Sequence, residues 1–294
     1  MKNTYGYDQL FLFAHCSLSE LHQHLRLHCE EQEAARVTDL TAAWKEVQTL
    51  LQTLHQNDAV GDTSLLQPLE RPAAALQATV ARTFPHMATT LHWVNIDSLI
   101  APQRNLDLDY IEQLKKEWPK EPTEAELVNI CLGSGKEVAI RVTENAPGQF
   151  VFSSASKDLR FLGTHVRRLQ PHEEWPTSGH AHLAVTALVG FGSPLASILK
   201  VNNRLILHNG FHRLYALRSI GVGAVPVVVQ HIQWAHRELP TQILGISRDF
   251  LLQSARPALM KDFFDPRLTC RLRGKPKVKT IQTQVTVNQQ DIAI

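Results

Sequence analysis

The chain of 294 residues is 44% hydrophobic and carries 30 basic and 28 acidic residues, for a formal net charge of +2. This composition suffices for the core of one large or two ordinary domains, and its balanced charge does not by itself indicate a nucleic-acid or membrane binder. The four scattered cysteines lack metal-ligand spacing, and no apolar run approaches the roughly 18 residues of a membrane span. With no secretory cleavage pattern near the N-terminus, we expect a cytoplasmic protein with reduced thiols and no metal site.

Residues 1–90 are predicted to form a helical N-terminal region. The stretch 8–56 shows helical periodicity, and Ser17 and Glu20 have the spacing of a capping box. From about Thr38 onward, apolar residues recur every three or four positions, as on the buried face of a helix. Gly61 and two prolines then interrupt, and a shorter helix is expected at about 73–83.

Residues 91–235 are predicted to form the central domain. WVNIDSLIAP (93–102) indicates a short strand that leads into a loop, and DLDYIEQLKKEW (107–118) indicates an amphipathic helix. Farther along, EVAIRVT (137–143) and QFVFSS (149–154) are typical of paired strands around a turn. The basic segment KDLRFLGTHVRRL is predicted to be a helix or a loop.

The pattern is clearest after residue 194. PLASILKV and NRLILHN flank Asn202 and Asn203, and asparagine tolerates the left-handed conformation of a tight hairpin turn. Apolar residues then recur every third position from Phe211, which predicts a helix that Gly221 or Gly223 ends. Pro226 opens the strand PVVVQ. The order is therefore strand, strand, glycine turn, helix, strand.

Residues 236–294 are predicted to form a C-terminal extension. A helix should cover much of 238–262, and two strands should form a β-hairpin around Arg273-Gly274-Lys275. The overall class is α/β (α+β). Basic residues alternate along the tail, which on one continuous strand would form a strip able to meet phosphates: Arg271, Arg273, Lys275, Lys277 and Lys279. The alternative is a solvated edge that resists aggregation.

The glycine turn before residue 211 has the chemistry of a phosphate cradle. A helix start presents unpaired N–H groups and partial positive charge, and Gly210 allows a ligand to approach the backbone. Arg213 can fork two donors onto a phosphate, and His212 can donate a hydrogen bond or shuttle a proton. His208 and Asn209 precede the turn and could add donors. The alternative is an ordinary strand–turn–helix connection.

The sequence resembles the ParB/sulfiredoxin superfamily over roughly residues 93–230. The stretch NGFHRLYAL followed by GVGAVPVVV is similar to the family signature of Gly-x-His-Arg, an alanine-containing helix, a glycine and a Val-Pro-Val strand. The segment before it, SPLASILKVNNRLIL, and the opening WVNIDSLIAPQRNLDLDYIEQL also resemble the family. The resemblance implies a ParB/sulfiredoxin-like core in which about 119–190 is an insertion.

Members of this family bind a nucleotide at this turn, so the resemblance implies a nucleoside di- or triphosphate (ATP, ADP or CTP) with Mg²⁺. Gly210, His212 and Arg213 would hold its phosphates, and Arg104 would correspond to the family's early arginine. Phe211 stands where sulfiredoxin has its reactive cysteine, which argues against sulfiredoxin chemistry. Asn209 replaces the usual acidic residue, and an amide cannot act as a general base.

Any catalytic base must therefore come from elsewhere. Asp107, Asp109 and Glu112 begin the helix after Arg104, which the family places near the nucleotide. With His212 they are the candidate catalytic residues. The alternative role of the three acids is to stabilise the start of the helix, where negative charge is favoured.

These observations leave three functions open. The leading one is a nucleotide-binding protein, either a phosphotransferase or a nucleotidase (NTPase). The second is a DNA-associated ParB-like module that binds DNA through the basic C-terminal strip. The third is a non-catalytic member whose N-terminal helices bind a protein partner. No membrane contact is expected.

Overall fold

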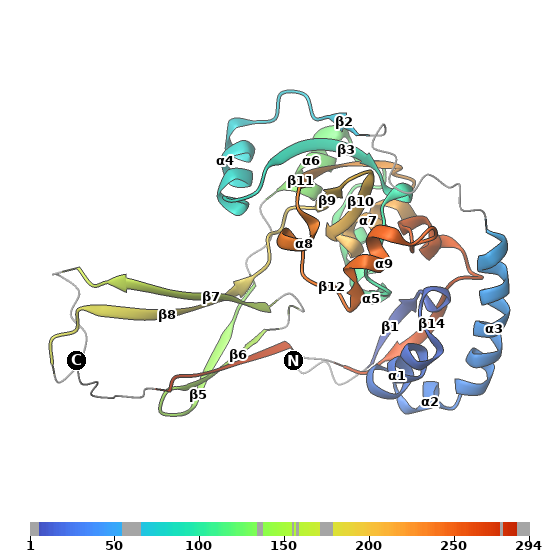
Figure 1. Cartoon of the computed structure of the whole chain (residues 1–294), viewed down its shortest axis with the longest axis horizontal. Coiled ribbons are helices and arrows are strands. Elements are labelled where there is room, and N and C mark those ends of the chain that lie inside the picture. The colour runs from blue at the N-terminus through green and yellow to red at the C-terminus, as the bar shows by residue number, and fades with distance from the viewer. Residues whose placement is uncertain are drawn as a thin grey trace. The chain divides into compact units, whose positions relative to one another are not determined.

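The computed structural model shows a mixed α and β protein (Figure 1), which confirms the α+β class expected from the sequence. The described residues are 6–54, 66–133, 138–154, 156, 159–170, 179–276 and 279–286. Among them, no helix combines the length and the apolar character that crossing a membrane requires.

Contacts divide the chain into two compact units. The first unit comprises Met1–Gly135 with Pro194–Pro276, and the second comprises Lys136–Ser193 with Lys277–Ile294. The expected boundaries near residues 90 and 235 both fall inside the first unit, because strands from all three expected segments pair with one another there. The second unit overlaps the expected insertion at about 119–190.

The first unit opens with a strand, so the helix predicted over residues 8–56 is wrong at its beginning. Strand β1 (Tyr7–Phe11) lies between β14 (Cys270–Gly274) and β4 (Asn105–Asp107), antiparallel to both. Its partners come about a hundred residues or more later in the chain, so local periodicity could not show the pairing.

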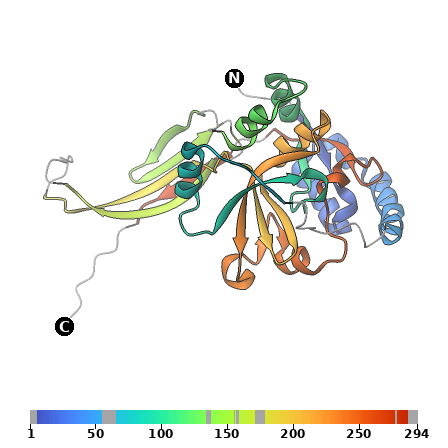
Figure 2. The same ribbon diagram turned by 90° about the horizontal axis from the view of Figure 1, so that it is seen from above.

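The helices that follow β1 agree with the prediction. They are the 3₁₀ helix η1 (Phe13–His15), α1 (Leu18–His28), α2 (Glu31–Ala34) and α3 (Val37–Thr53). The capping box at α1 is confirmed: the Ser17 hydroxyl accepts from the Glu20 amide at 3.2 Å, and the Glu20 carboxylate accepts from the Ser17 amide at 2.7 Å. Figure 1 and Figure 2 both show these helices, in blue, gathered beside β1 and β14. Residues 55–56 and Gly61 lie outside the described residues.

A five-stranded sheet forms the centre of the first unit. Its strand order is β10 (Arg204–Asn209), β9 (Ser197–Val201), β11 (Ala224–Ile232), β3 (Thr89–Asn95) and β2 (Gln67–Pro68). The predicted hairpin of β9 and β10 is confirmed, with Asn202 at a φ of 52° in the turn. Helix α7 (Phe211–Ser219) then joins β10 to β11, which runs parallel to β9 and antiparallel to β3.

Three more helices belong to the first unit. They are α4 (Ala74–Thr83), α5 (Leu108–Glu117) and α6 (Glu124–Leu132), and the first two match the predicted helices. The 3₁₀ helix η3 (Ile96–Ser98) follows β3. Strand β11 contributes to two hydrophobic clusters. Val225 and Val227–Val229 pack in the cluster that contains Leu214 of α7, whereas Ile232 packs in the cluster that contains Ile243.

The long helix predicted over 238–262 is wrong in large part. The structure has short pieces instead: α8 (Ala235–Glu238), β12 (Gln242–Ile243), β13 (Ile246–Ser247), α9 (Arg248–Gln253) and the 3₁₀ helix η4 (Met260–Phe264). Leu244 and Gly245 have φ values of 51° and 84°, which turn the chain back between β12 and β13. Pro257 further prevents a continuous helix.

The described part of the second unit contains two small sheets. One has the order β15 (Lys279–Gln284), β6 (Gln149–Ser154), β5 (Arg141–Ala146), and the other pairs β7 (Leu159–Arg168) with β8 (Leu183–Phe191). The pairing of β5 with β6 is confirmed, whereas the segment predicted as a helix or a loop is strand β7. The predicted C-terminal β-hairpin is wrong, because β14 pairs with β1 and β15 pairs with β6.

Candidate functional site

The turn between β10 and α7 requires glycine for two reasons. Gly210 has φ 105° and ψ 14°, a left-handed conformation that side chains disfavour. A Cβ atom there would lie 3.3 Å from both Ala196 Cβ and Leu214 Cδ1. No side chain caps the helix start, and the Gly210 carbonyl accepts the first helical hydrogen bond from Leu214. The first turn of α7 is therefore an uncapped helix N-terminus reached through a fixed glycine.

His212 joins the starts of two helices. Its Nε2 accepts a hydrogen bond from the Asp107 backbone N–H at 3.0 Å, and its ring meets Tyr110 edge-on at 5.5 Å. A neutral imidazole that accepts at Nε2 carries its proton on Nδ1. The structure thus brings together two predicted segments, the start of α7 and the start of α5.

Arg213 points toward helix α6. Its Nη1 donates to the carbonyls of Ile130 and Cys131, each at 3.0 Å. These carbonyls lie at the C-terminal end of α6, where the helix dipole favours a cation. The guanidinium predicted to fork onto a phosphate thus holds α6 against α7 in this structure.

The three acidic candidates take part in separate contacts. Asp107 caps α5, because its Oδ1 accepts from the Tyr110 amide at 3.0 Å. Asp109 accepts from the Asp8 amide at 3.1 Å, and Glu112 pairs with Lys115 at 2.8 Å. Asp107 is the member of this set that contacts His212. The capping role is thus observed for Asp107.

Arg104 lies in the loop before β4 and pairs with Glu20 of α1 at 2.6 Å. Burial alone would raise the pKa of Glu20, but hydrogen bonds from Arg104 and Ser17 outweigh it and lower that pKa. Within the described residues the buried Arg104 Nε has no hydrogen-bond partner. The ion pair draws the guanidinium toward the N-terminal helices.

Two buried polar residues, Ser197 and Gln230, contact the end of β10. The sequence pattern did not indicate them as site residues. His208 Nδ1 lies 3.3 Å from Ser197 Oγ and 3.2 Å from Gln230 Nε2. Asn209 turns its amide inward and donates to the Leu195 carbonyl at 3.0 Å. The pattern that could have indicated Ser197 and Gln230 is a polar residue within an apolar strand, as in LASIL and VVVQ.

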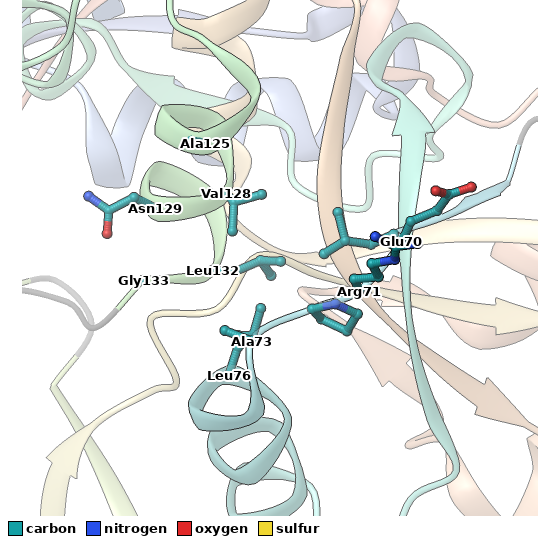
Figure 3. A pocket seen from close by; sticks show the side chains of 11 residues that line it. Glu70, Arg71, Ala73, Leu76, Ala125, Val128, Asn129, Leu132 and Gly133 are labelled. Atoms are coloured by element: carbon teal, nitrogen blue, oxygen red, sulfur yellow. The ribbon is translucent and has the colours of Figure 1, made fainter.

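A hollow of about 280 Å³ lies between helix α6 and the segment that leads into α4 (Figure 3). Its walls are mostly apolar, with Leu76, Val128 and Leu132 among them. Arg71, at its rim, has a φ of 49°. None of the predicted site residues lines this hollow, so it is separate from the α7 turn.

The thiols and the basic tail do not add to the site. Burial raises the pKa values of Cys16, Cys131 and Cys270 to about 12, so these thiols are poor nucleophiles. Within the described part of the chain, no three His, Cys, Asp or Glu side chains gather as a metal site would require. Arg273 pairs with Asp8 at 2.6 Å.

The predicted basic strip is only partly described. Lys275 donates to the Arg26 carbonyl at 3.0 Å, and Arg271 is exposed on β14. Lys277 and the side chain of Lys279 lie outside the described residues. The described part of the strip thus has both arginines on β14, and Lys275 follows them.

No protein-family model matches this chain, no curated protein matches it, and no solved structure matches it. A function therefore has to be inferred from the α7 turn itself. That turn offers backbone N–H groups at a helix start, a glycine in a left-handed conformation that sets the direction of the helix, and His212 fixed by the Asp107 amide. Such an arrangement suits an anionic group better than a nucleophilic reaction.

Proposed function

We propose that this protein binds a nucleoside di- or triphosphate whose phosphates lie at the first turn of α7. The observation that carries the proposal is Gly210, held at φ 105° before a nine-residue helix that no side chain caps. Backbone N–H groups and the helix dipole stabilise an anion at such a point. The resemblance of this turn to the ParB/sulfiredoxin signature supports the same ligand class, in a core of that type.

Arg213 has a positioning role in this proposal. Its bonds to the carbonyls of Ile130 and Cys131 hold the end of α6 against the first turn of α7. His212 orients the start of α5 through the Asp107 amide. Mg²⁺ would arrive with the nucleotide, as it does with nucleotides in general.

The contacts of the acidic residues favour binding over catalysis. Asp107 is occupied as a helix cap, and Asp109 and Glu112 contact Asp8 and Lys115. Phosphoryl transfer or hydrolysis would require a base within reach of the attacking group. We therefore propose a nucleotide-binding protein, with turnover as a secondary property to be measured on the same samples.

The test is a binding titration of ATP, ADP, CTP and GTP, each with and without Mg²⁺. The matched variants are Gly210→Ala and Gly221→Ala, because both replace a glycine with positive φ on either side of α7. A Cβ at Gly221 meets nothing within 4 Å, whereas one at Gly210 lies 3.3 Å from Ala196 Cβ and from Leu214 Cδ1. Both variants should lose stability from backbone strain, by about 1–2 kcal/mol.

Only Gly210→Ala should also lose affinity, by about tenfold or more, because its methyl group would press on Ala196 and Leu214 and displace the first turn of α7, whose N–H groups would hold the phosphate. Gly221→Ala should keep the wild-type affinity, and the ligand should still raise its melting temperature by mass action. Wild-type protein that binds none of the four nucleotides would refute the proposal. Equal affinities of the two variants would move the site away from this turn.

A further inference from the structure

Strands β7 and β8 form a two-stranded ribbon, and within the described residues neither strand pairs with a third. The register places Val166 opposite Val185 and Arg168 opposite Leu183, so these side chains share one face with Phe161. Phe161 is 50% exposed, Val166 59%, Leu183 61% and Val185 75%. An apolar face this open, on a ribbon of only two strands, marks an interaction surface.

The two edges of the ribbon differ in charge. β7 reads LRFLGTHVRR, with three arginines, one histidine and no acidic residue. β8 reads LAVTALVGF, with neither a charged residue nor a proline. Charged residues and prolines are the usual guards against unwanted pairing at a strand edge. β8 is therefore the unguarded edge.

We propose that the ribbon binds a second copy of this chain by antiparallel pairing of β8 with β8 across a twofold axis. The product is a four-stranded sheet in which the two β8 strands are central and the two β7 strands are outermost. The apolar faces of both ribbons then form one continuous surface. Pairing gives the exposed β8 backbone the hydrogen bonds that an edge strand lacks.

The difference in charge between the two edges favours pairing of two copies through β8 over pairing through β7. Two copies that met through β7 would set arginines against arginines, which is destabilising, whereas β8 opposes no charges at all. A foreign acidic strand would be drawn to β7 instead. The arginines of β7 also protect the outer edges of the four-stranded sheet against further strand pairing, so the isologous assembly stops at a dimer.

The oligomeric state of the full chain tests this directly, by sedimentation or by light scattering during gel filtration. Wild-type protein should be a dimer at about 100 µM, a concentration that populates even micromolar dimers. Val185→Lys should weaken the dimer by about tenfold or more, because pairing about Ala187 sets this lysine against the apolar Val189 of the second copy. Val142→Lys is the matched control: Val142 is 54% exposed on β5 of the same unit, and its replacement should leave the dimer intact.

A cysteine pair fixes the register. Ala187 is the middle residue of β8, so pairing about the centre brings its two copies within the 4.4–6.8 Å Cα separation that a disulfide needs. Ala187→Cys should therefore form a cross-linked dimer under mild oxidation. Thr164→Cys is the control, since Thr164 lies opposite Ala187 on β7. Its two copies would be three strand spacings apart, about 14 Å, and should not cross-link.

A wild-type monomer at that concentration would overturn the proposal. So would a dimer that survives Val185→Lys, because its interface would lie elsewhere. Hydrogen exchange is the last measurement: the β8 backbone amides should exchange more slowly in the dimer than in the monomer. Protection that appears only when duplex DNA is added would replace the second copy with nucleic acid, and would equally overturn the proposal.

Discussion

The two units of the molecule differ in where their apolar side chains lie. The first unit buries many of its apolar residues in two hydrophobic clusters. In the described part of the second unit only Leu159 and Ser154 are buried, while Val142 and Val185 stand in solvent. Burial of apolar side chains therefore stabilises the first unit. Strand pairing accounts for more of the stability of the second unit, whose apolar surface is left available to partners.

The largest expected effect tests the interior of the first unit. Asp262 is 3% exposed and accepts two hydrogen bonds from Arg256, at 2.7 and 2.9 Å, and one from the Leu259 amide at 2.9 Å. Asp262→Asn should lower the free energy of unfolding by about 3–5 kcal/mol, because it leaves the Arg256 charge buried without its partner. Urea unfolding measures the loss.

Asp265→Asn is the matched control for that experiment. Asp265 pairs with Arg267 at 2.6 Å, but the arginine is largely exposed, so this surface pair should contribute little to the free energy of unfolding. Similar losses for the two variants would show that the Asp262 contacts are no stronger than a surface ion pair. The interior of the first unit would then owe little to them.

Leu159 gives the next test, in the second unit. It is fully buried at the start of β7, and Leu159→Ala should cost about 2–5 kcal/mol, the usual range for a buried leucine. Leu183→Ala on β8 should cost less than about 0.5 kcal/mol in the monomer, because Leu183 is exposed. Hydrogen exchange of the β7 and β8 amides measures the loss of stability in each of the two variants. Equal effects would mean that Leu159 does not anchor the ribbon.

Acid should act on the first unit through Asp262. Burial alone would raise its pKa, but contacts with His15 and Arg256 outweigh it and hold that pKa at about 2, below the ordinary 3.8. The ionised carboxylate therefore stabilises the fold above about pH 5, and this contribution of roughly 2 kcal/mol is lost as the pH falls toward 2. The free energy of unfolding, measured from pH 5 to pH 2, should fall less steeply in Asp262→Asn. A parallel decline in both proteins would assign the effect to other groups.

The smallest effects come from one substitution made in both units. Val228→Thr places a hydroxyl in the buried centre of β11 and should cost about 1–3 kcal/mol. Val185→Thr makes the same change on the exposed face of β8 and should change the free energy of unfolding by less than about 0.5 kcal/mol. Thermal unfolding at a concentration that keeps the protein monomeric compares them. A large effect at Val185 would mean that its side chain is covered within one chain.

Local signals in the sequence predicted the local parts of this fold. Asn202 fixed the hairpin of β9 and β10, the apolar repeat from Phe211 predicted α7, and Ser17 with Glu20 marked the start of α1. Strand β1 was missed, because what makes it a strand is pairing with residues 105–107 and 270–274. Strand β7 was missed because its charged and apolar residues follow no single period.

The candidate site shows the same limit. The sequence indicated Gly210 as a turn before a helix, since glycine chemistry is local. The direction of Arg213 depends on α6, about eighty residues earlier, and no local pattern reports that contact. Ser197 and Gln230 gather at His208 only because β9, β10 and β11 are neighbours in the sheet. Contacts between distant segments decide which side chains meet.

The position of β1 also governs how the protein is made. The ribosome synthesises Phe11 about 260 residues before its partner Cys270. At translation rates of about 5–20 residues per second, β1 waits roughly 13–50 s for that partner. During this interval β1 keeps an open edge with the apolar side chains of Tyr7, Leu10 and Phe11, so we expect chaperones to bind the nascent chain. The first unit completes its N-terminal sheet only after residues 270–274 have been made, so we expect products truncated before them to be degraded or to aggregate.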